Sequence, residues 1–311
     1  MLHCQKNFSD YVGNLEKLIF SSPFSEKDML SSLKRKILET ELVVPVIGAF
    51  SSGKSTLINA FLGSSVLSVG ITPETELATE LRYAPDSYLL AIKKDGTEER
   101  FPVDALTEVN RRSSEFLFLR LYLNNAALKD IAPLVDMPGF GSSLENHNKA
   151  ISFYMPRGVH FIVLTSVEEG SITQSMLRQL NEIRDYGADF SFLLSKADLR
   201  APEEVREVAD YIGEQILHYL DDTHRVIPVS IGDGQPLDKA LRALNPEAMF
   251  SSLFYDQLKD RNFDTIEQIN LALRTLSQDA EQRNAELAAL EKALRELETQ
   301  QESAIAEAKS K

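Results

Sequence analysis

A short glycine-rich segment constrains this chain more than any other feature of its sequence. Residues 48–56 read GAFSSGKST, which matches the pattern G-x-x-x-x-G-K-[ST] in full. The apolar run 43–47 before it is typical of a buried strand, and residues 55–61 after it are typical of a helix. Glycines let backbone N–H groups turn towards the phosphates of a nucleotide, and the helix N-terminus adds partial positive charge. The segment therefore predicts a phosphate cradle.

Individual residues of the cradle have distinct expected roles. Lys54 should reach the β- and γ-phosphate oxygens, and the hydroxyl of Ser55 should bind Mg²⁺. The residues that we expect to contact the phosphates are Gly48, Ser51, Ser52, Gly53, Lys54, Ser55 and Thr56.

A second motif, DMPG at residues 136–139, follows the apolar pair Leu134 and Val135. An aspartate at the end of such a strand lies at the carboxyl edge of the sheet, beside the cradle. We expect Asp136 to hold the Mg²⁺ through water and the N–H of Gly139 to face the γ-phosphate.

A third motif, SKAD at residues 195–198, follows the apolar run 190–194. The carboxylate of Asp198 can accept two N–H donors from guanine, and the stem of Lys196 can lie along the base. Adenine offers no such pair of donors, so an unpaired carboxylate would reject it. Ser195 departs from the asparagine or threonine that is usual at this position. The motif predicts guanine as the base.

In this order the three motifs resemble those of translation-factor-type GTPases. Residues 47–75 narrow the resemblance to the dynamin superfamily, most closely to bacterial dynamin-like proteins and more loosely to mitofusins. The resemblance implies a switch threonine that closes over Mg²⁺ and the γ-phosphate, for which we choose Thr75, with Thr72 as the alternative. It also implies that Ser230, after the last strand, backs the base. The implied catalytic set is Lys54, Ser55, Thr75, Asp136 and Gly139, with Ser55, Thr75 and Asp136 at the metal.

One residue departs from the classical dynamin pattern. Phe50 stands where those proteins have a glutamine that positions the attacking water, and phenylalanine has no polar group for that task. Hydrolysis should then be slow, or should need a second subunit to order the water or supply positive charge. Arg82, Arg157 and Arg178 are candidates for that charge, although a solvated or salt-bridged arginine is the better interpretation of each.

Other polar residues receive simpler interpretations. Glu168 and Glu169 are adjacent carboxylates, which are typical of a solvated corner. His160 lies on an apolar run and is interpreted as a core histidine, and His147 as an exposed loop histidine.

Short apolar runs alternate with helical stretches after residue 42, which predicts an α/β fold with a mostly parallel sheet. Lys93 to Gly96 predict a hairpin turn, because an Asp-Gly pair tolerates positive φ. The expected strands are 42–47, 78–83, 88–93, 116–123, 133–136, 159–165, 190–194 and 226–229. The expected helices are 55–61, 103–112, 145–154, 173–186, 202–220 and 237–244.

Three parts are expected along the chain: helices of a neck at 1–41, the GTPase domain at 42–245, and a helical or coiled-coil segment at 246–311. The two ends should together build a helical bundle. A leucine-rich seam runs from Ile266 to Leu297 at three-then-four spacing. This seam predicts either packing on the N-terminal helices or a coiled coil between chains. Because the last helix has no stop signal, we expect the chain to be a fragment.

The charge and apolar content limit the partners. A net charge of −14 argues against nucleic acid, which needs a surplus of Lys and Arg. No apolar run approaches the roughly 20 residues that span a bilayer. Cys4 is the only cysteine, and no secretory signal is visible, so we expect a cytoplasmic protein. Contact with a membrane would be peripheral, through regions absent from this chain.

The sequence thus predicts a dynamin-like GTPase that binds GTP with Mg²⁺ and hydrolyses it. The resemblance implies GTP-dependent pairing into a homodimer or oligomer, through the GTPase domain and the helices, and movement of a helical neck on a membrane. Two alternatives remain. One is a weakly hydrolysing GTP-dependent switch or scaffold that acts through its coiled coil. The other is a GTPase associated with RNA or the ribosome, which the acidic charge disfavours.

Overall fold

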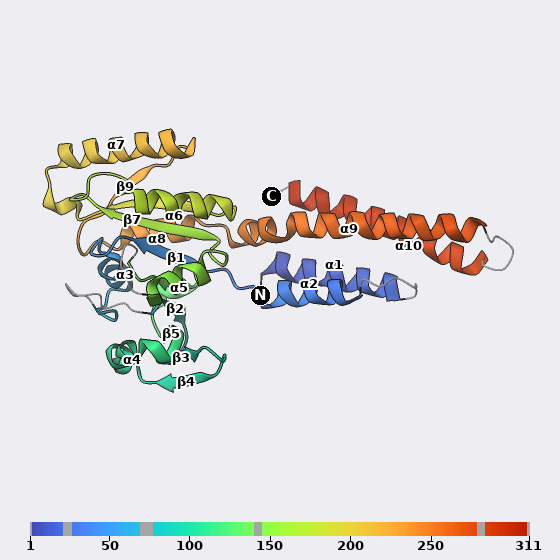
Figure 1. Ribbon diagram of the computed structural model, residues 1–311, viewed down its shortest axis with the longest axis horizontal. Coiled ribbons are helices and arrows are strands. Elements are labelled where there is room, and N and C mark those ends of the chain that lie inside the picture. The colour runs from blue at the N-terminus through green and yellow to red at the C-terminus, as the bar shows by residue number, and fades with distance from the viewer. Residues whose placement is uncertain (1, 21–26, 69–76, 140–144, 279–283, 310–311) are drawn as a thin grey trace. The chain divides into compact units, whose positions relative to one another are not determined.

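The computed structural model describes residues 2–20, 27–68, 77–139, 145–278 and 284–309. The chain divides into two compact units (Figure 1). One unit comprises residues 42–244, and the other combines residues 1–41 with residues 245–311. Segments from opposite ends of the chain therefore build one unit.

The unit of residues 42–244 is built on a nine-stranded sheet in the order β4-β3-β5-β2-β6-β1-β7-β8-β9. Its strands are β1 (Val44–Gly48), β2 (Thr79–Tyr83), β3 (Tyr88–Lys93), β4 (Glu98–Phe101), β5 (Phe116–Leu123), β6 (Leu134–Asp136), β7 (His160–Ser166), β8 (Asp189–Ser195) and β9 (Val226–Pro228). Strands β6, β1, β7, β8 and β9 run parallel to one another. Strand β2 is parallel to β5 but antiparallel to β6, and β3 is antiparallel to both of its neighbours. The predicted α/β fold with a mostly parallel sheet is confirmed.

Strand β4 is missing from the strands that the sequence predicts. The hairpin turn before it does form, with Gly96 at a φ of 84° and the N–H of Lys93 donating to the carbonyl of Thr97 at 2.9 Å. The four residues of β4 read EERF and alternate between exposed and half-buried positions. A short, charged edge strand carries too little apolar alternation to be recognised from its sequence.

Helices cover both faces of the sheet. One apolar layer packs α5 (Glu145–Tyr154), α6 (Gln174–Asp185) and α7 (Pro202–Leu220) on the first face. The other packs α3 (Lys54–Leu62), α4 (Leu106–Arg111) and α8 (Gln235–Ala243) on the second. Short 3-10 turns lie at η1 (Val103–Ala105), η2 (Ser113–Glu115), η3 (Ala126–Leu128) and η4 (Ala197–Leu199). All seven residues of β7 are buried, because this strand has apolar side chains on both faces. The central strands thus form a rigid support for the loops at their carboxyl ends.

In the second unit the described residues form four helices. They are α1 (His3–Phe20), α2 (Lys27–Glu39), α9 (Pro246–Gln278) and α10 (Asn284–Lys309). Helix α1 contacts both α2 and α9, and α10 lies along α9 (Figure 1). Ile269 and Leu297, which belong to the leucine-rich seam, are buried, so these two residues pack within the chain. None of the described helices combines the length and the apolar character that crossing a bilayer requires.

Polar contacts also join the ends of the chain in this unit. The Glu247 carboxylate accepts the backbone N–H groups of His3 and Cys4, each at 2.8 Å, and so caps the first turn of α1. The hydroxyl of Tyr11 donates to Asn262 Oδ1 at 2.7 Å. Burial raises the pKa of Tyr11 to about 12, so the phenol stays a donor across the physiological range.

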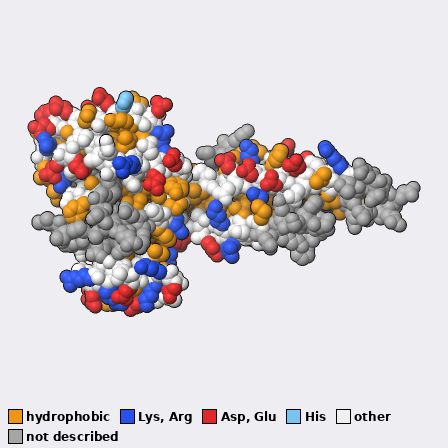
Figure 2. Space-filling view, in the orientation of Figure 1, with side chains coloured by type: hydrophobic (Ala, Val, Ile, Leu, Met, Phe, Trp, Pro, Cys, Tyr) orange, Lys and Arg blue, Asp and Glu red, His pale blue; other side chains and the backbone are white. Residues whose placement is uncertain are grey.

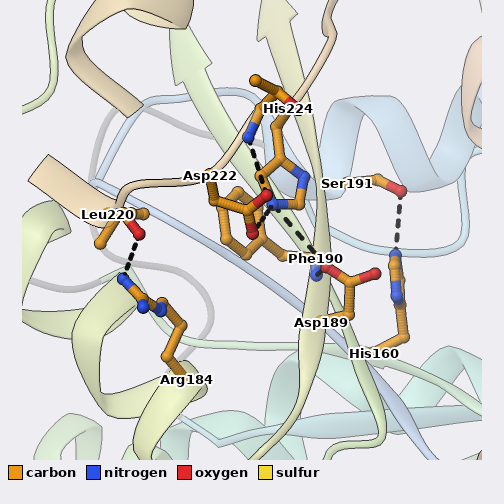
Figure 3. A network of polar contacts seen from close by, with 9 residues as sticks. His160, Arg184, Asp189, Phe190, Ser191, Leu220, Asp222 and His224 are labelled. Carbon is orange, nitrogen blue, oxygen red and sulfur yellow. Dashed lines mark hydrogen bonds and ion pairs between the residues drawn. The ribbon is translucent and has the colours of Figure 1, made fainter. Parts of the chain in front are cut away.

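A cluster of polar side chains lies at the amino ends of β7 and β8, the edge of the sheet opposite the phosphate cradle (Figure 3). His160 Nε2 and Ser191 Oγ lie 2.9 Å apart, and the His160 side chain is buried. The ring of His224 stacks on Phe190 with the ring centroids 3.9 Å apart, and its Nε2 lies 3.1 Å from Asp222 Oδ2. This cluster is remote from the phosphate cradle and bears on stability.

We expect His160 to make the protein less stable in acid. Burial lowers the pKa of His160, while Asp189 raises it and His224 lowers it further. A folded-state pKa below the unfolded value of about 6.5 stabilises the fold above that value, and this contribution is lost as the pH falls through the folded pKa.

A variant without a titrating group at this position tests the expectation. His160→Gln keeps a polar partner for Ser191 without titrating. Urea unfolding at about pH 7 and about pH 5 should therefore show a smaller acid loss for H160Q than for the native chain. His218→Gln, at an exposed site on α7, is the matched control and should keep the native loss. An equal acid loss for H160Q and the native chain would rule this explanation out.

Candidate functional site

The predicted phosphate cradle is the loop between β1 and α3. Gly48 ends β1, and Lys54 begins α3. Ser51 and Gly53 have positive φ angles of 61° and 89°, so the chain turns sharply before the helix. A Cβ on Gly48 would lie 2.3 Å from the carbonyl oxygen of Leu164, so this position has no room for a side chain. The loop places the N-terminus of α3 at the carboxyl edge of the parallel strands, where anions are favoured.

The side chain of Lys54 folds back over this loop. Its Nζ donates to the carbonyl oxygens of Gly48 and Ala49, each at 3.0 Å, and the residue is 7% exposed. Burial lowers the pKa of Lys54 to about 8, and the carboxylates of Asp136 and Glu169 act in the opposite direction. At neutral pH Lys54 therefore remains mostly in its protonated, positively charged form. The cradle holds one buried positive charge that can neutralise phosphate oxygens.

Ser55 and Asp136 meet beside Lys54. The Ser55 hydroxyl, in the first turn of α3, donates to Asp136 Oδ2 at 2.8 Å. Asp136 ends β6, which pairs with β1 in parallel, and is 1% exposed. Hydroxyl and carboxylate oxygens are ligands that Mg²⁺ prefers. The donor set therefore fits Mg²⁺, and Ser55 and Asp136 are the described residues that would hold it.

Gly139 packs directly against the cradle. A Cβ at this position would lie 2.8 Å from Cα and 2.9 Å from N of Phe50. Only a glycine lets the segment after β6 approach the loop so closely. Thr75 and its alternative Thr72, which the resemblance assigns to the switch, lie outside the described residues.

Ser195 connects the base motif to the cradle. Its Oγ lies 2.6 Å from the carbonyl oxygen of Ser52 and 3.1 Å from that of Thr165, and the residue is 6% exposed. Ser52 is buried as well, whereas Ser51 is exposed and Thr56 is half-buried in the first turn of α3. The serine that departs from the usual motif thus joins β8 to the phosphate loop.

The predicted base-binding residues come together at the ends of β8 and β9. Lys196 adopts a left-handed backbone conformation, with φ 58°. Asp198 Oδ1 accepts the N–H of Ile231 at 2.7 Å, which brings Asp198 next to the neighbouring Ser230. Asp198 and Ser230 are both exposed. Two loops that are distant in sequence therefore share one edge of the site.

The two glutamates of the turn after β7 make contacts that their sequence does not indicate. Glu168 Oε2 lies 2.5 Å from Lys196 Nζ. Glu169 Oε2 accepts the hydroxyl of Thr165 at 2.6 Å. Both glutamates are exposed, as a solvated corner requires, but Glu168 also contacts Lys196 of the base motif, and Glu169 contacts the buried Thr165. Neighbouring carboxylates carry no signal in the sequence that would reveal such partners.

The surroundings of Phe50 and of Arg82 agree with the interpretation of each residue from the sequence. This side chain is 40% exposed and offers no polar group to a water molecule. Arg82, a candidate source of positive charge, forms an ion pair with Glu80 at 2.8 Å, which agrees with the salt-bridged interpretation. His147 lies in helix α5, so its interpretation as a loop residue is wrong, and its side chain lies outside the described residues.

Surface charge is mixed on the face of the molecule that Figure 2 shows. Asp and Glu side chains alternate there with Lys and Arg over the unit of residues 42–244. On this face the two signs of charge are interspersed and do not gather into one large area.

Comparison with known proteins adds a family match. Residues 44–197 match the sequence profile described as the Dynamin family. This segment runs from β1 to the base motif and includes the cradle, Asp136 and Gly139.

Individual relatives match over longer stretches of the chain. An uncharacterised protein encoded in the xynA 3′ region of Caldicellulosiruptor sp. (strain Rt8B.4) is 28% identical over an alignment of 214 residues, and the match covers 66% of this chain and 52% of that protein. Dynamin-like protein 2 of Campylobacter jejuni is 27% identical over an alignment of 250 residues, and the match covers 75% of this chain and 40% of that protein. The chain thus spans about half of the first relative and less of the second.

A similar fold occurs in a solved structure. It contains a member of an oligomerised bacterial dynamin pair, described as a mechanism for long-range sensing and tethering of membranes. The superposition has a TM-score of 0.57 at 16% identity and covers 99% of this chain and 54% of the other. At this identity the likeness concerns the fold, which here includes both units.

Proposed function

Because residues 44–197 belong to the dynamin family, we propose that this chain binds GTP with Mg²⁺ and hydrolyses it to GDP and phosphate. The observation that carries the proposal is the 2.8 Å contact between Ser55 Oγ and Asp136 Oδ2, which joins residues 81 positions apart. It brings Ser55 and Asp136, two of the three expected metal ligands, together beside the buried Lys54. Asp198 supplies the carboxylate that selects guanine over adenine.

In the proposed reaction, the oxygen of a water molecule forms a bond to the γ-phosphorus. The bond from that phosphorus to the β–γ bridging oxygen breaks, and the proton of the water passes to the released phosphate. When bound, Mg²⁺ neutralises charge on the β- and γ-phosphate oxygens. Lys54 and the N–H of Gly139 stabilise the same charge, and Thr75 closes over the γ-phosphate.

The attacking water needs a partner that Phe50 does not provide. We propose that a second copy of the chain supplies it, because the exposed phenyl ring has no hydrogen-bonding group. The active form is then a homodimer or a larger oligomer. Its contacts would involve the GTPase domain at 42–245 and the helices at 1–41 and 246–311, with a coiled coil formed by the segment at 246–311.

We further propose that the protein acts on a membrane from its cytoplasmic side. The four-helix unit would act as a neck that moves when GTP is hydrolysed, and lipid contact would come from segments outside this chain. The fold shared with a membrane-tethering bacterial dynamin pair supports this extension. Sedimentation with anionic vesicles should then depend on GTP for a longer product that contains those segments.

Turnover tests the enzymatic part of the proposal. We expect the rate of phosphate release from GTP, per molecule of protein, to rise with protein concentration, because pairing completes the site. Chelation of Mg²⁺ should abolish the release, and Asp136→Asn measured in parallel controls for contaminating enzymes. ATP hydrolysis at the same rate as GTP hydrolysis, or no GTP turnover by folded protein at any concentration, would refute the proposal.

A further inference from the structure

The ion pair between Glu168 and Lys196 connects two loops at the edge of the base site. Glu168 Oε2 lies 2.5 Å from Lys196 Nζ, and the side chains are 56% and 24% exposed. Lys196 is thus better shielded from water than Glu168. The pair joins the turn after β7 to the SKAD segment that follows β8.

Backbone contacts fix the turn that carries Glu168. The carbonyl oxygen of Ser166 accepts the N–H groups of Glu169 at 3.1 Å and Gly170 at 3.4 Å, and Gly170 has a φ of 65°. The N–H of Val167 donates to the carbonyl of Ser195 at 3.0 Å, and the Val167 side chain is 1% exposed. The turn is therefore attached to the residue that immediately precedes Lys196.

The two carboxylates of the turn have different partners. Glu169 accepts a hydrogen bond from the hydroxyl of Thr165, which is fully buried. Glu168 faces the opposite loop, where Lys196 provides its partner. Because Glu169 is bonded to Thr165, Glu168 is the carboxylate of this turn that interacts with Lys196.

The backbone of Lys196 sets where its side chain starts. Its φ of 58° and ψ of 32° place it in the left-handed region, and the buried Ser195 before it is tied to the cradle. The four torsions of the Lys196 side chain are not fixed by the backbone. A lysine without a partner loses the entropy of these torsions when its stem is immobilised against a ligand. An ion pair at the far end of the stem restricts these torsions before any ligand arrives.

We propose that Glu168 is a positioning residue for base recognition, which holds the ammonium of Lys196 so that the methylene stem is presented to the purine. The inference rests on the proposed function, because it assumes that a guanine nucleotide occupies this edge. The contact of Glu168 is with Lys196 of the base motif and not with the phosphate cradle. Its removal should therefore weaken GDP and GTP binding to the same extent.

A double-mutant cycle tests the proposal. Glu168→Gln should weaken binding of GDP, with Mg²⁺ present, by about threefold to fivefold, the upper range for a single partly exposed ion pair. Lys196→Met keeps an apolar stem but has no ammonium for Glu168 to hold. In that background E168Q should change the affinity by no more than the error of the titration.

Glu204→Gln is the matched control. Glu204 pairs with Arg200 at 3.6 Å, and its side chain is 56% exposed, the same fraction as that of Glu168. E204Q should bind GDP as the native chain does. Thermal unfolding of all four variants verifies that differences in affinity do not come from loss of fold.

The outcomes separate this inference from the proposed function. If native protein binds no GDP, the proposed function fails and the inference fails with it. If native protein binds GDP but E168Q binds it equally well, or more tightly, only the positioning role of Glu168 is overturned. The same holds if E168Q weakens binding to an equal degree in the K196M background, because Glu168 then acts by another route.

Discussion

Lys54→Ala is expected to lower the affinity for GTP by about 30-fold or more and to abolish turnover at concentrations that saturate the native chain. The substitution removes the buried ammonium of the cradle, which donates to the carbonyls of Gly48 and Ala49. Loss of one partner of a buried, charge-assisted contact costs about 2–5 kcal/mol. Calorimetric titration and phosphate release measure the two effects.

The control for this substitution is Lys94→Ala. Lys94 also donates to a backbone carbonyl, that of Ser114 at 2.9 Å, but it does so on the exposed β3–β4 turn. K94A should bind and hydrolyse GTP as the native chain does. Native-like binding by K54A would contradict the assignment of residues 48–56 as the phosphate cradle.

Gly139→Ala is expected to reduce turnover by about 100-fold and to weaken GTP binding, because the added methyl group displaces the cradle. The new Cβ would lie 2.8 Å from Cα of Phe50, a backbone atom that cannot rotate away as a side chain can. Displacement of a reacting group by about 1 Å suffices for an effect of this size. Phosphate release at saturating GTP measures it.

Gly213→Ala serves as the matched control for that substitution. Gly213 lies within α7, and a Cβ there would meet nothing within 4 Å. G213A should keep native turnover and gain about 0.5–1 kcal/mol of stability from the better helix propensity of alanine. If G139A also retains native turnover, the close approach of Gly139 to the loop has no role in the reaction.

The phosphate end of the site could be predicted from sequence because its chemistry is local. Gly48, Lys54 and Ser55 lie within one loop and one helical turn, so a fixed spacing encodes their arrangement. Asp136 is distant in sequence, but it ends a strand, and the carboxyl ends of parallel strands share one edge. The contact between Ser55 and Asp136 agrees with that reasoning, while the roles of these residues in binding and catalysis stay predictions.

Contacts that depend on the exact course of a turn could not be predicted. Glu168 and Glu169 look alike in the sequence, yet one contacts Lys196 and the other Thr165. This difference arises from the Ser166–Gly170 turn and its attachment to Ser195, and no spacing rule encodes it. The role of Ser195 in bonding to the cradle was hidden for the same reason.

The same distinction applies to the fold. Strands with long apolar runs, such as β7, were predicted close to their observed bounds because burial on both faces leaves a strong pattern. The short edge strand β4 carries no such pattern. In the helical unit the seam predicted either packing within the chain or pairing between chains. The burial of Ile269 and Leu297 within one chain accounts for those two residues.

The decisive experiment is calorimetric titration of the folded chain with GTP and with ATP, both in the presence of Mg²⁺. We expect saturable binding of GTP that disappears when Mg²⁺ is chelated. ATP should bind more weakly by at least about 100-fold, because adenine does not offer the Asp198 carboxylate the pair of N–H donors that guanine does. Equal affinity for the two nucleotides, or no binding of GTP, would show that the chain is not a guanine-nucleotide-binding protein.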